Sequence, residues 1–248
     1  ASVTRLLSTA EQEDPEFAAQ CEEDRLQLAA IRQSRESKAA EWFEAHAEDW
    51  DDLRRLHSPD EQVEAVLRVA LEENPLGEML DIGTGTGRMA ELFAQRASRI
   101  VALDKSLEML RVARAKLQHL PADKVELVQG DFLSLPFEPA SFDTVLLHQV
   151  LHYATDPLIA LREAARVLRP GGRIAIVDFA AHDHEELRER FQHTRLGFED
   201  DHLADALRRT GFEPSSPVSL DGQALAVTIW VARRVETLAT RNKTRKTV

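Results

Sequence analysis

The sequence predicts an α/β fold with a mostly parallel sheet, preceded by a helical extension, and three observations support this prediction. Residues 1 to about 74 lack glycine and are dense in alanine, glutamate, arginine, leucine and glutamine, which is typical of helices with charged faces. From residue 78, short apolar runs alternate with amphipathic stretches, which indicates βα units. Near the C-terminus, two extended runs flank Asp221-Gly222, a dipeptide typical of hairpin turns.

Three helices are expected in the extension. Two of them should cover Pro15 to Ser37 and Lys38 to Trp50. The third should begin at the start signal Ser58-Pro59-Asp60-Glu61 and run to about Glu73. Asn74-Pro75-Leu76-Gly77 then breaks the helical pattern, so we expect a helical extension over residues 1–74 and a separate domain from residue 75.

The domain over residues 75–235 should contain five parallel strands and a closing antiparallel pair. The parallel strands are expected at Met79 to Ile82, Arg99 to Leu103, Val125 to Val128, Phe142 to Leu147 and Arg173 to Phe179. The antiparallel pair is expected at Phe212 to Leu220 and Ala224 to Ala232. Residues 236–248 are basic and polar without apolar periodicity, so we expect a flexible tail there.

Charge and cysteine content restrict the class of partner and compartment. Acidic residues outnumber basic ones by 43 to 31, giving a formal net charge of −12 that disfavours nucleic acid as a partner. The only cysteine, Cys21, allows neither a disulfide framework nor a cysteine metal site within one chain, which fits a reducing cytoplasm. No apolar run is long enough to span a membrane, and no signal-peptide pattern is present.

Three glycines follow the first expected strand at a spacing of two residues. The segment Gly83-Thr84-Gly85-Thr86-Gly87 leads into a helix expected near Arg88. Such glycines permit a tight turn and close backbone approach to a ligand, and a helix N-terminus offers free N–H groups. Ligands of open α/β sheets bind at the carboxyl ends of strands beside the switch in strand order. The loop therefore predicts a site for a small ligand.

The spacing of the loop argues against a dinucleotide. The fingerprint G-x-G-x-x-G, counted from Gly83, needs its third glycine at the position of Arg88. Asp81 precedes the loop and could accept hydrogen bonds from an ammonium group or orient the loop. A zwitterionic amino-acid ligand therefore fits better than a pyrophosphate. An NAD-dependent oxidoreductase is the weaker alternative, and failure to bind a nicotinamide cofactor would exclude it.

Asp104 ends the second expected strand, about twenty residues after the glycines. A carboxylate at this position can accept hydrogen bonds from both hydroxyls of a ribose. The alternative is that Asp104 belongs to the N-cap region of the helix that follows Lys105-Ser106. After this glycine loop we favour ribose binding.

Five segments between about residues 76 and 179 resemble, in the expected order, the class I S-adenosylmethionine-dependent methyltransferases of the type 11 group, which includes quinone-biosynthesis enzymes. The segments are Asp81 to Gly87, Asp104, Gly130-Asp131-Phe132-Leu133-Ser134-Leu135-Pro136-Phe137, Ser141-Phe142-Asp143-Thr144-Val145 and Leu168-Arg169-Pro170-Gly171-Gly172-Arg173. The resemblance implies a Rossmann-like seven-stranded, mostly parallel sheet with helices on both faces and an antiparallel C-terminal hairpin.

The same resemblance implies the chemistry of the site. S-adenosylmethionine would be the cofactor, S-adenosylhomocysteine its product and a small molecule the methyl acceptor. Asp131 and Phe132 would flank the adenine, and His148-Gln149 would lie beside the methionine part. Without the resemblance, Gly130-Asp131 is only a turn after a strand. The implied cofactor-binding residues are Asp81, Gly83, Thr84, Gly85, Gly87, Asp104, Lys105, Met109, Asp131, Phe132 and His148.

A narrower resemblance extends over three further segments. His148-Gln149-Val150-Leu151-His152-Tyr153, Asp178-Phe179-Ala180-Ala181-His182-Asp183 and Arg195-Leu196-Gly197-Phe198 are similar to the methyltransferase half of bacterial proteins that fuse an ArsR-type winged-helix repressor to this enzyme. Residues 1 to about 40 would then resemble the connector after a DNA-binding domain that precedes residue 1. Arsenite is disfavoured as a substrate, because several cysteines are needed to hold arsenic.

Histidines gather after the fourth and fifth expected strands. His148, His152 and His182 are the candidate catalytic residues, and His184 and His193 lie nearby in sequence. Their imidazoles could accept a proton from an acceptor hydroxyl or amine, or select the acceptor by hydrogen bonding. The alternative for each histidine is packing or solvation, since methyl transfer depends mainly on positioning and desolvation. No spacing is diagnostic of a metal site, and none is expected.

Two hypotheses of different class follow. The leading one is an enzyme that methylates a small molecule. The other is a domain of a transcriptional regulator that senses S-adenosylmethionine or S-adenosylhomocysteine, and binding without an acceptor-dependent product would favour it. Trp42, Phe43 and Trp50 are interpreted as packing residues, with a lid as the alternative. The helices of the first 74 residues could also pair two chains in a homodimer.

Overall fold

The computed structural model describes residues 2–55, 60–222 and 225–235. The chain divides into two compact units, residues 1–41 and residues 42–248. The second unit contains the sheet and all the candidate site residues. The domain limits expected from the sequence, residues 1–74, 75–235 and 236–248, remain predictions.

The N-terminal unit consists of α1 (Ser2–Glu13) and most of α2 (Pro15–His46). The last residues of α2, from residue 42 on, belong to the second unit. The Asp14 carboxylate accepts the N–H groups of Glu16 and Phe17 at 3.0 and 3.2 Å, which caps α2. The expected break between Ser37 and Lys38 is wrong, because α2 continues through it. Neither glycine nor proline interrupts the sequence there, so nothing ends the helix. Helix α1 was not expected from the sequence.

Two shorter helices precede the sheet, α3 (Trp50–Arg55) and α4 (Asp60–Ala70). The start signal Ser58-Pro59 lies outside the described residues. Helix α4 buries Val63 and Leu67 in the core. It ends before the expected Glu73, where the Glu72 N–H group donates to the carbonyl of Val69 and tightens the last turn.

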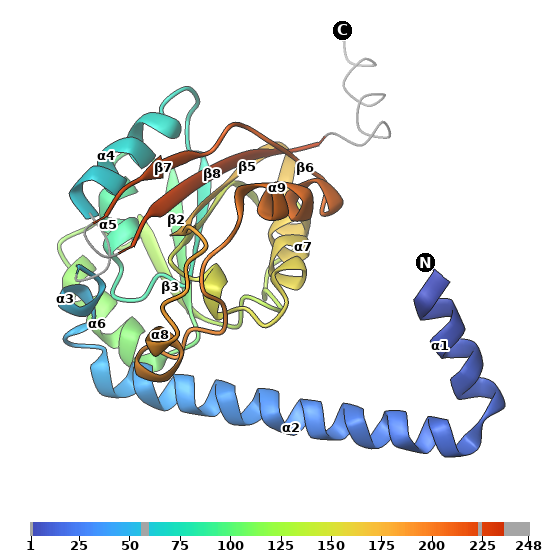
Figure 1. Ribbon diagram of the computed structural model, residues 1–248. Helices are drawn as coiled ribbons and strands as arrows, with labels where there is room; N and C mark the ends of the chain where they lie inside the picture. Colours follow the sequence, from blue (N-terminus) through green and yellow to red (C-terminus); the bar gives the residue numbers. More distant parts are fainter. Residues whose placement is uncertain (1, 56–59, 223–224, 236–248) are drawn as a thin grey trace, which may run out of the picture. The chain divides into compact units, whose positions relative to one another are not determined.

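The described residues form one sheet with the strand order β3-β2-β1-β4-β5-β8-β6, in which β7 also pairs with β8 (Figure 1). Strands β1 to β5 are parallel, and β8 is antiparallel to β5, β6 and β7. The bounds are β1 (Glu78–Ile82), β2 (Arg99–Asp104), β3 (Val125–Gln129), β4 (Phe142–His148), β5 (Leu168–Phe179), β6 (Phe212–Pro214), β7 (Val218–Leu220) and β8 (Val227–Arg234). The mostly parallel sheet and its antiparallel C-terminal strands confirm the predicted fold class.

The single strand expected over Phe212 to Leu220 is divided. Strands β6 and β7 pair with successive parts of β8, so they lie end to end along one edge and fill the seventh position of the sheet. The interruption includes Pro217, which lacks the N–H group that a ladder would need. The expected start of the last strand at Ala224 lies outside the described residues.

Strand β5 begins at Leu168, five residues before its expected start at Arg173. Phe142 pairs with Leu168 and Thr144 with Arg173, so the residues between them bulge out of the ladder. The segment Leu168 to Arg173, which precedes the expected strand, is therefore part of β5, and Gly171 in it has a φ of 77°.

Helices cover both faces of the sheet. One face packs on α4, α5 (Arg88–Phe93), α6 (Leu107–Leu117) and α8 (Glu186–Arg190), and the other on α7 (Pro157–Val167) and α9 (Asp200–Arg209). Met79 and Leu80 belong to the two opposite clusters, as successive residues of a doubly covered strand must. None of the described helices could cross a membrane.

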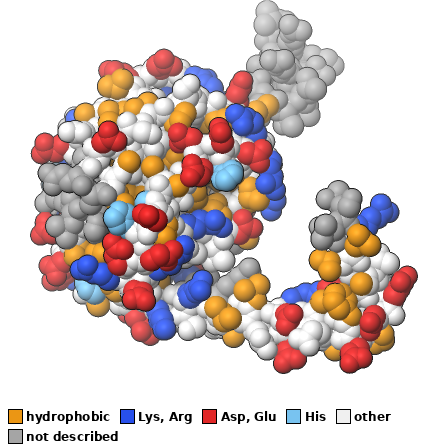
Figure 2. Space-filling model, viewed as in Figure 1, with side chains coloured by type: hydrophobic (Ala, Val, Ile, Leu, Met, Phe, Trp, Pro, Cys, Tyr) orange, Lys and Arg blue, Asp and Glu red, His pale blue; other side chains and the backbone are white. Residues whose placement is uncertain are grey.

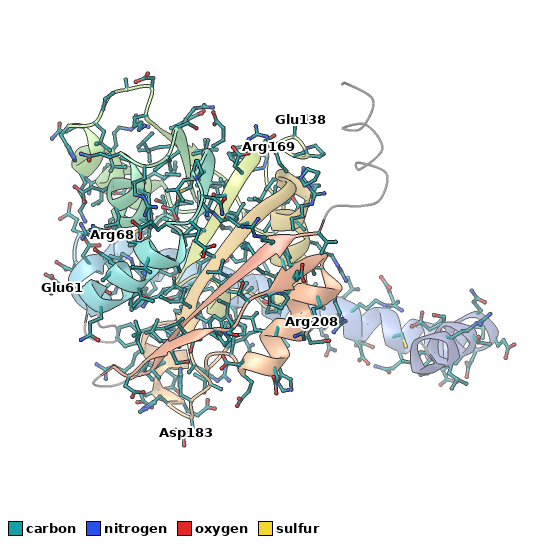
Figure 3. The ribbon with its side chains drawn as sticks, turned by 90° about the horizontal axis from the view of Figure 1, so that it is seen from above. Glu61, Arg68, Glu138, Arg169, Asp183 and Arg208 are labelled. Carbon is teal, nitrogen blue, oxygen red and sulfur yellow. The ribbon has the colours of Figure 1, made fainter. Side chains whose placement is uncertain are left out.

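Different segments lie at the two ends of the parallel strands, the amino ends and the carboxyl ends. Figure 3 shows Glu138 and Arg169, near the starts of β4 and β5, at one edge, and Asp183, which follows β5, at the opposite edge. The glycine loop, the segment after β4 and the segment after β5 all follow strand carboxyl ends. The topology therefore brings them to one edge, where α/β sheets bind ligands.

Candidate functional site

The glycine loop between β1 and α5 has a backbone that only glycine adopts readily. Gly83, Gly85 and Gly87 have φ angles of 67°, 55° and 84°. A Cβ on Gly83 would lie 2.3 Å from a methyl group of Val150, so the absence of a side chain there is also a packing requirement. Gly87 is the N-cap of α5 and turns the chain into that helix. The loop thus approaches the segment after β4 closely.

Asp81 is the buried, next-to-last residue of β1 and precedes Ile82 and the loop. The Thr84 hydroxyl donates to Asp81 Oδ2 at 2.6 Å, whereas Asp81 Oδ1 is buried and has no hydrogen-bond partner among the described residues. Burial raises the pKa of Asp81 to about 7. An ammonium group bound at the loop would supply the missing donor and restore the ionised form. The position therefore suits an ammonium group.

Asp104 lies at the end of β2, beside the loop. Its Oδ2 accepts the N–H of Gly85 at 2.8 Å and its Oδ1 accepts the N–H of Ser106 at 2.9 Å. Burial raises the pKa of Asp104. The N-cap of α6 is Ser106, whose hydroxyl accepts the Met109 N–H, so Asp104 is not the capping residue. Its carboxylate instead links β2 to the glycine loop.

Asp131 and Lys105 meet after β3 and β2. Lys105 Nζ lies 2.9 Å from Asp131 Oδ2, and the N–H of Leu133 donates to Asp131 Oδ1 at 2.9 Å. Phe132 packs against the core cluster that contains Leu103, and Met109 is a buried residue in the first turn of α6. The residues expected around an adenine thus come from neighbouring segments.

The chain turns sharply after β4. His148 is the last residue of that strand and is buried. Gln149 has a φ of 55°, which is uncommon for a residue with a side chain, and its N–H donates to the Val177 carbonyl at 2.7 Å. The Gln149 Nε2 atom is buried without a hydrogen-bond partner among the described residues. Strained backbone and an unused amide together are typical of a binding position.

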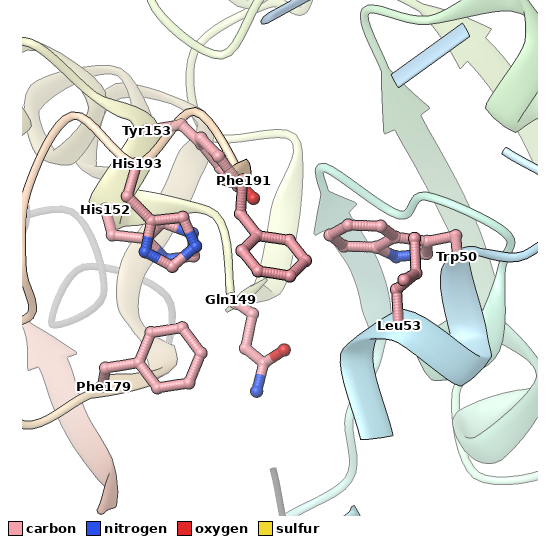
Figure 4. Close-up of a pocket in the computed structure, with 8 residues that line it drawn as sticks. All are labelled: Trp50, Leu53, Gln149, His152, Tyr153, Phe179, Phe191 and His193. Carbon is pink, nitrogen blue, oxygen red and sulfur yellow. The ribbon is translucent and has the colours of Figure 1, made fainter. Parts of the chain in front are cut away.

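A pocket opens beside this turn (Figure 4). Its empty space, counted together with the open solvent at its mouth, is about 310 Å³. The lining residues come from α3, the turn after β4, the end of β5 and the segment after α8. They are Trp50, Leu53, Gln149, His152, Tyr153, Phe179, Phe191 and His193. The walls are mainly aromatic, and the lining side chains carry an amide, two imidazoles, a phenol hydroxyl and an indole N–H as polar groups.

Helix α3 connects the pocket to the glycine loop. Trp50 lines the pocket, and its Nε1 lies 3.3 Å from where a Cβ on Gly85 would be. The Thr86 hydroxyl donates to Asp51 Oδ1 at 2.6 Å, and Lys116 forms an ion pair with the same carboxylate. Helix α3 therefore lies directly on the loop, and the pocket and the loop share a wall.

The structure separates the three candidate catalytic histidines. His152 lines the pocket, whereas His148 and His182 are not among its lining residues. The rings of His152 and His193 lie 4.2 Å apart, and those of His182 and His184 lie 5.5 Å apart. Burial lowers the pKa of His182. Within residues 2–55, 60–222 and 225–235, no three His, Cys, Asp or Glu side chains form a metal-binding group.

His152 is held by an acid, Asp178, whose role the sequence pattern did not predict. Its Nδ1 lies 2.8 Å from Asp178 Oδ1, and its backbone N–H donates to Asp178 Oδ2 at 3.1 Å. A carboxylate inside the apolar run of β5 was the available signal, because a buried acid needs partners. Phe191 gave no signal, since nothing in its local sequence links it to the segment after β4. Trp50 packs on Trp42 and Phe43 and also lines the pocket.

Comparison with known proteins agrees with this geometry. Residues 80–176 match a family described as a methyltransferase domain. The 2-phytyl-1,4-naphtoquinone methyltransferase of Thermosynechococcus vestitus is 40% identical over 116 residues, which are 46% of this chain and 50% of that protein. An uncharacterised methyltransferase of Geobacillus kaustophilus is 31% identical over 176 residues, covering 67% of this chain and 78% of the relative.

The chain spans half or less of the length of some curated relatives, 42% and 50% in two of them. Among solved structures, phosphoethanolamine N-methyltransferase 2 of Haemonchus contortus in complex with S-adenosyl-L-methionine superposes with a TM-score of 0.61 at 18% identity. That alignment covers 71% of this chain and 53% of the other. At this identity the superposition establishes a shared fold.

Proposed function

The chain belongs to the methyltransferase-domain family, whose cofactor is S-adenosylmethionine, and from this premise we propose that it transfers the cofactor's methyl group to a small-molecule acceptor. The observation that carries the proposal is the wall shared by the aromatic pocket and the glycine loop, formed by Trp50 against Gly85. An acceptor in the pocket would thereby lie next to a cofactor on the loop.

Specific residues would hold the cofactor. The unpartnered Oδ1 of Asp81 suits the ammonium group, and Asp104 suits the ribose hydroxyls. Asp131 and Phe132, with Lys105 paired to Asp131 and Met109 in the first turn of α6, suit the adenine. The positive φ angles of Gly83, Gly85 and Gly87 allow close approach of the backbone, with Thr84 fixing Asp81 and His148 near the methionine part. When bound, the cofactor supplies an electrophilic methyl group on its sulfonium.

Calorimetric titration with S-adenosylhomocysteine tests the cofactor site. We expect micromolar binding to the full chain and at least about tenfold weaker binding to Asp104→Asn, because a charge-assisted hydrogen bond to the ribose is lost. Asp205→Asn is the matched control, since Asp205 is exposed on α9. Unchanged affinity in Asp104→Asn, or binding of NAD with equal affinity, contradicts the proposal.

The acceptor class is supported by relatives and by the pocket. Two of the relatives are named as 2-phytyl-1,4-naphtoquinone methyltransferase and demethylmenaquinone methyltransferase. The aromatic lining of the pocket suits a flat, largely apolar acceptor of comparable kind. Mass spectrometry of the products formed from a panel of naphthols, catechols and alkylamines would identify the class, and modification of alkylamines alone would contradict a ring acceptor.

The sensory alternative has one observation in its favour. Every side chain from residue 22 to residue 31 of α2 is exposed, including Leu26, Leu28 and Ile31. A helix exposed on all sides is typical of a connector between domains, as in the ArsR-type fusions, or of a helix that pairs with a second copy. A sensor would bind S-adenosylmethionine and release it unchanged. Light scattering of the purified chain tests the homodimer. A cytoplasmic location remains a prediction.

A further inference from the structure

The pocket contains two buried polar atoms that the protein leaves unused. His152 Nε2 and Gln149 Nε2 have no hydrogen-bond partner among the described residues. Both side chains line the pocket, and His152 and Gln149 are 1% and 5% exposed. Buried polar atoms are normally paired, because an unpaired one costs about 1–3 kcal/mol. Two such atoms in one pocket point to a ligand that pairs with both.

Asp178 fixes which of these atoms accepts and which donates. The backbone N–H groups of His152 and Phe179 both donate to the Asp178 carboxylate, so this group acts as an acceptor. Its contact with His152 Nδ1 at 2.8 Å therefore needs the proton on Nδ1. The neutral ring then presents a bare lone pair on Nε2. The Gln149 amide nitrogen, in contrast, can only donate.

The surroundings of His152 suit a base in a largely apolar site. Tyr153, Phe179 and His193 pack around its ring at centroid distances of 4.1, 5.3 and 4.2 Å. Burial, with the Asp178 charge as a smaller cause, raises the pKa of Tyr153, so its hydroxyl stays neutral. Three titratable groups face His152: Asp178 from β5, Tyr153, which is its neighbour in the chain, and His193 from the segment after α8. His182 interacts with His152 electrostatically from the segment after β5.

We propose that His152, oriented by Asp178, is the base that removes a proton from the methyl acceptor, and that the acceptor is a flat aromatic ring carrying an ionisable hydroxyl and a second oxygen. The hydroxyl proton pairs with His152 Nε2, and the second oxygen accepts from Gln149 Nε2. Trp50 and Phe179 supply apolar walls for the ring. This assignment rests on the proposed function and narrows its acceptor. His152 is the catalytic residue and Asp178 a positioning residue.

The step balances within the methyl transfer. The hydroxyl proton passes to His152 Nε2 as the acceptor oxygen, or the ring carbon beside it, forms a bond to the methyl carbon. The bond between sulfur and that carbon breaks, and its electron pair stays on sulfur as S-adenosylhomocysteine. If a ring carbon is methylated, that carbon then loses its own proton and the hydroxyl is restored. In both cases one proton leaves to solvent through His152. No oxidant or metal is needed.

Imidazole nitrogen NMR tests the histidine without any turnover. In the full chain saturated with S-adenosylhomocysteine, the His152 resonances, assigned by their loss in His152→Gln, should show a neutral ring protonated at Nδ1. In Asp178→Asn the preference for Nδ1–H should be lost. His184→Gln, which changes an exposed histidine, should leave the His152 pattern unchanged. A ring of His152 protonated at Nε2 in the unaltered chain overturns the proposal.

A matched pair of probes tests the acceptor class. Binding of 4-methoxy-1-naphthol and of 1,4-dimethoxynaphthalene is measured on the chain loaded with S-adenosylhomocysteine. We expect the naphthol to bind about tenfold more tightly, because only it can donate to His152. His152→Gln should remove the difference, and His184→Gln should keep it.

Loss of cofactor binding and loss of acceptor discrimination have different consequences. Failure to bind S-adenosylhomocysteine removes the proposed function itself. If that ligand binds but both naphthalenes bind equally, or neither binds, the acceptor class is overturned. Methyl transfer from S-adenosylmethionine to the naphthol should show a kcat at least about a hundredfold lower in His152→Gln, since general base catalysis contributes about 10²–10⁴-fold. An unchanged kcat overturns the role of His152.

Discussion

Asp81 shows how one residue of this site couples protonation to cofactor binding. Its pKa is raised by burial to about 7, above the usual value of 3.8. Below about pH 7 the neutral carboxyl is therefore favoured in the unliganded fold. The stability that this residue contributes is present below pH 3.8 and is lost as the pH rises through about 7. An ammonium ligand reverses the preference, because it pairs with the ionised form.

Asp81→Asn should therefore flatten the pH dependence of stability. Between pH 5 and pH 8 the free energy of unfolding of the unliganded chain should fall by on the order of 2 kcal/mol more than that of the variant. Denaturant titrations of both chains at the two pH values measure this difference. The affinity of the unaltered chain for S-adenosylhomocysteine should rise over the same interval, and that of the variant should not. Parallel pH profiles for the two chains would refute the assignment.

Gly83 allows a second test at a single residue. Gly83→Ala combines a positive φ of 67° with a Cβ 2.3 Å from Val150, so it should lower the free energy of unfolding by about 3 kcal/mol and weaken cofactor binding. Gly211 has a φ of 90° but nothing within 4 Å of an added Cβ. Gly211→Ala should thus cost only about 1 kcal/mol and leave binding intact. Chemical denaturation and calorimetry compare the two, and equal losses would contradict the packing argument.

Residues of the site differ in how far the sequence reveals them. Asp81 and Asp104 lie at the carboxyl ends of the buried strands β1 and β2, and local order is enough to place both at the glycine loop. The pairing of His152 with Asp178 joins residues 26 apart and depends on the register of β4 against β5. Phe191 follows α8 directly and lines the pocket because of the irregular backbone there. Such contacts depend on tertiary structure, so residue spacing could not predict them.

At the scale of elements, α3 has the clearest consequence. This six-residue helix is too short to be stable alone, so its order depends on contacts with the loop. The bond from Thr86 to Asp51 is one such contact. Sequence periodicity could not reveal α3, because six residues make fewer than two turns and are too few to show a pattern. The continuous α2 and the early start of β5 were missed for a related reason, since propensity alone locates element ends poorly.

Removal of that hydrogen bond should loosen α3. Thr86→Val keeps the shape of the side chain but loses the donor, so amide hydrogen exchange in residues 50–55 should accelerate about tenfold, as expected for a bond worth about 1 kcal/mol or slightly more. Thr210→Val is the control, because the Thr210 hydroxyl donates to Ala206 within α9. Exchange in α3 that responds equally to both variants would show that the bond does not hold this helix.

At the scale of the whole molecule, the chain separates into a helical N-terminal unit and a unit that holds the sheet. The alternation of apolar runs predicted the parallel sheet, because strands buried on both faces read as continuous apolar segments. The division of the expected strand over residues 212–220 into β6 and β7 could not be predicted, since it depends on how each part pairs with β8. On the face shown in Figure 2, acidic, basic and apolar side chains are interspersed on the sheet unit.

Two truncations should distinguish the possible domain limits. A chain beginning at Trp42 should unfold cooperatively and retain its affinity for S-adenosylhomocysteine, because residues 1–41 form a unit of their own. A chain beginning at Pro75 loses Val63, Leu67 and Leu71, each fully buried and each worth about 1.5–3 kcal/mol. It should be unfolded or strongly destabilised. Circular dichroism during heating compares them, and a stable chain from residue 75 would support the boundary expected from composition.

The position of Trp50 gives this protein an intrinsic optical signal. The sequence holds three tryptophans, of which Trp230 is fully enclosed by the core and Trp42 packs on other aromatic rings. Only the indole of Trp50 both contacts the glycine loop and borders the pocket. Occupation of either place changes the polarity around that indole and so shifts its fluorescence. Ligand binding could therefore be followed in real time on the unlabelled protein. Trp50→Phe is the control, because its remaining fluorescence comes from Trp42 and Trp230.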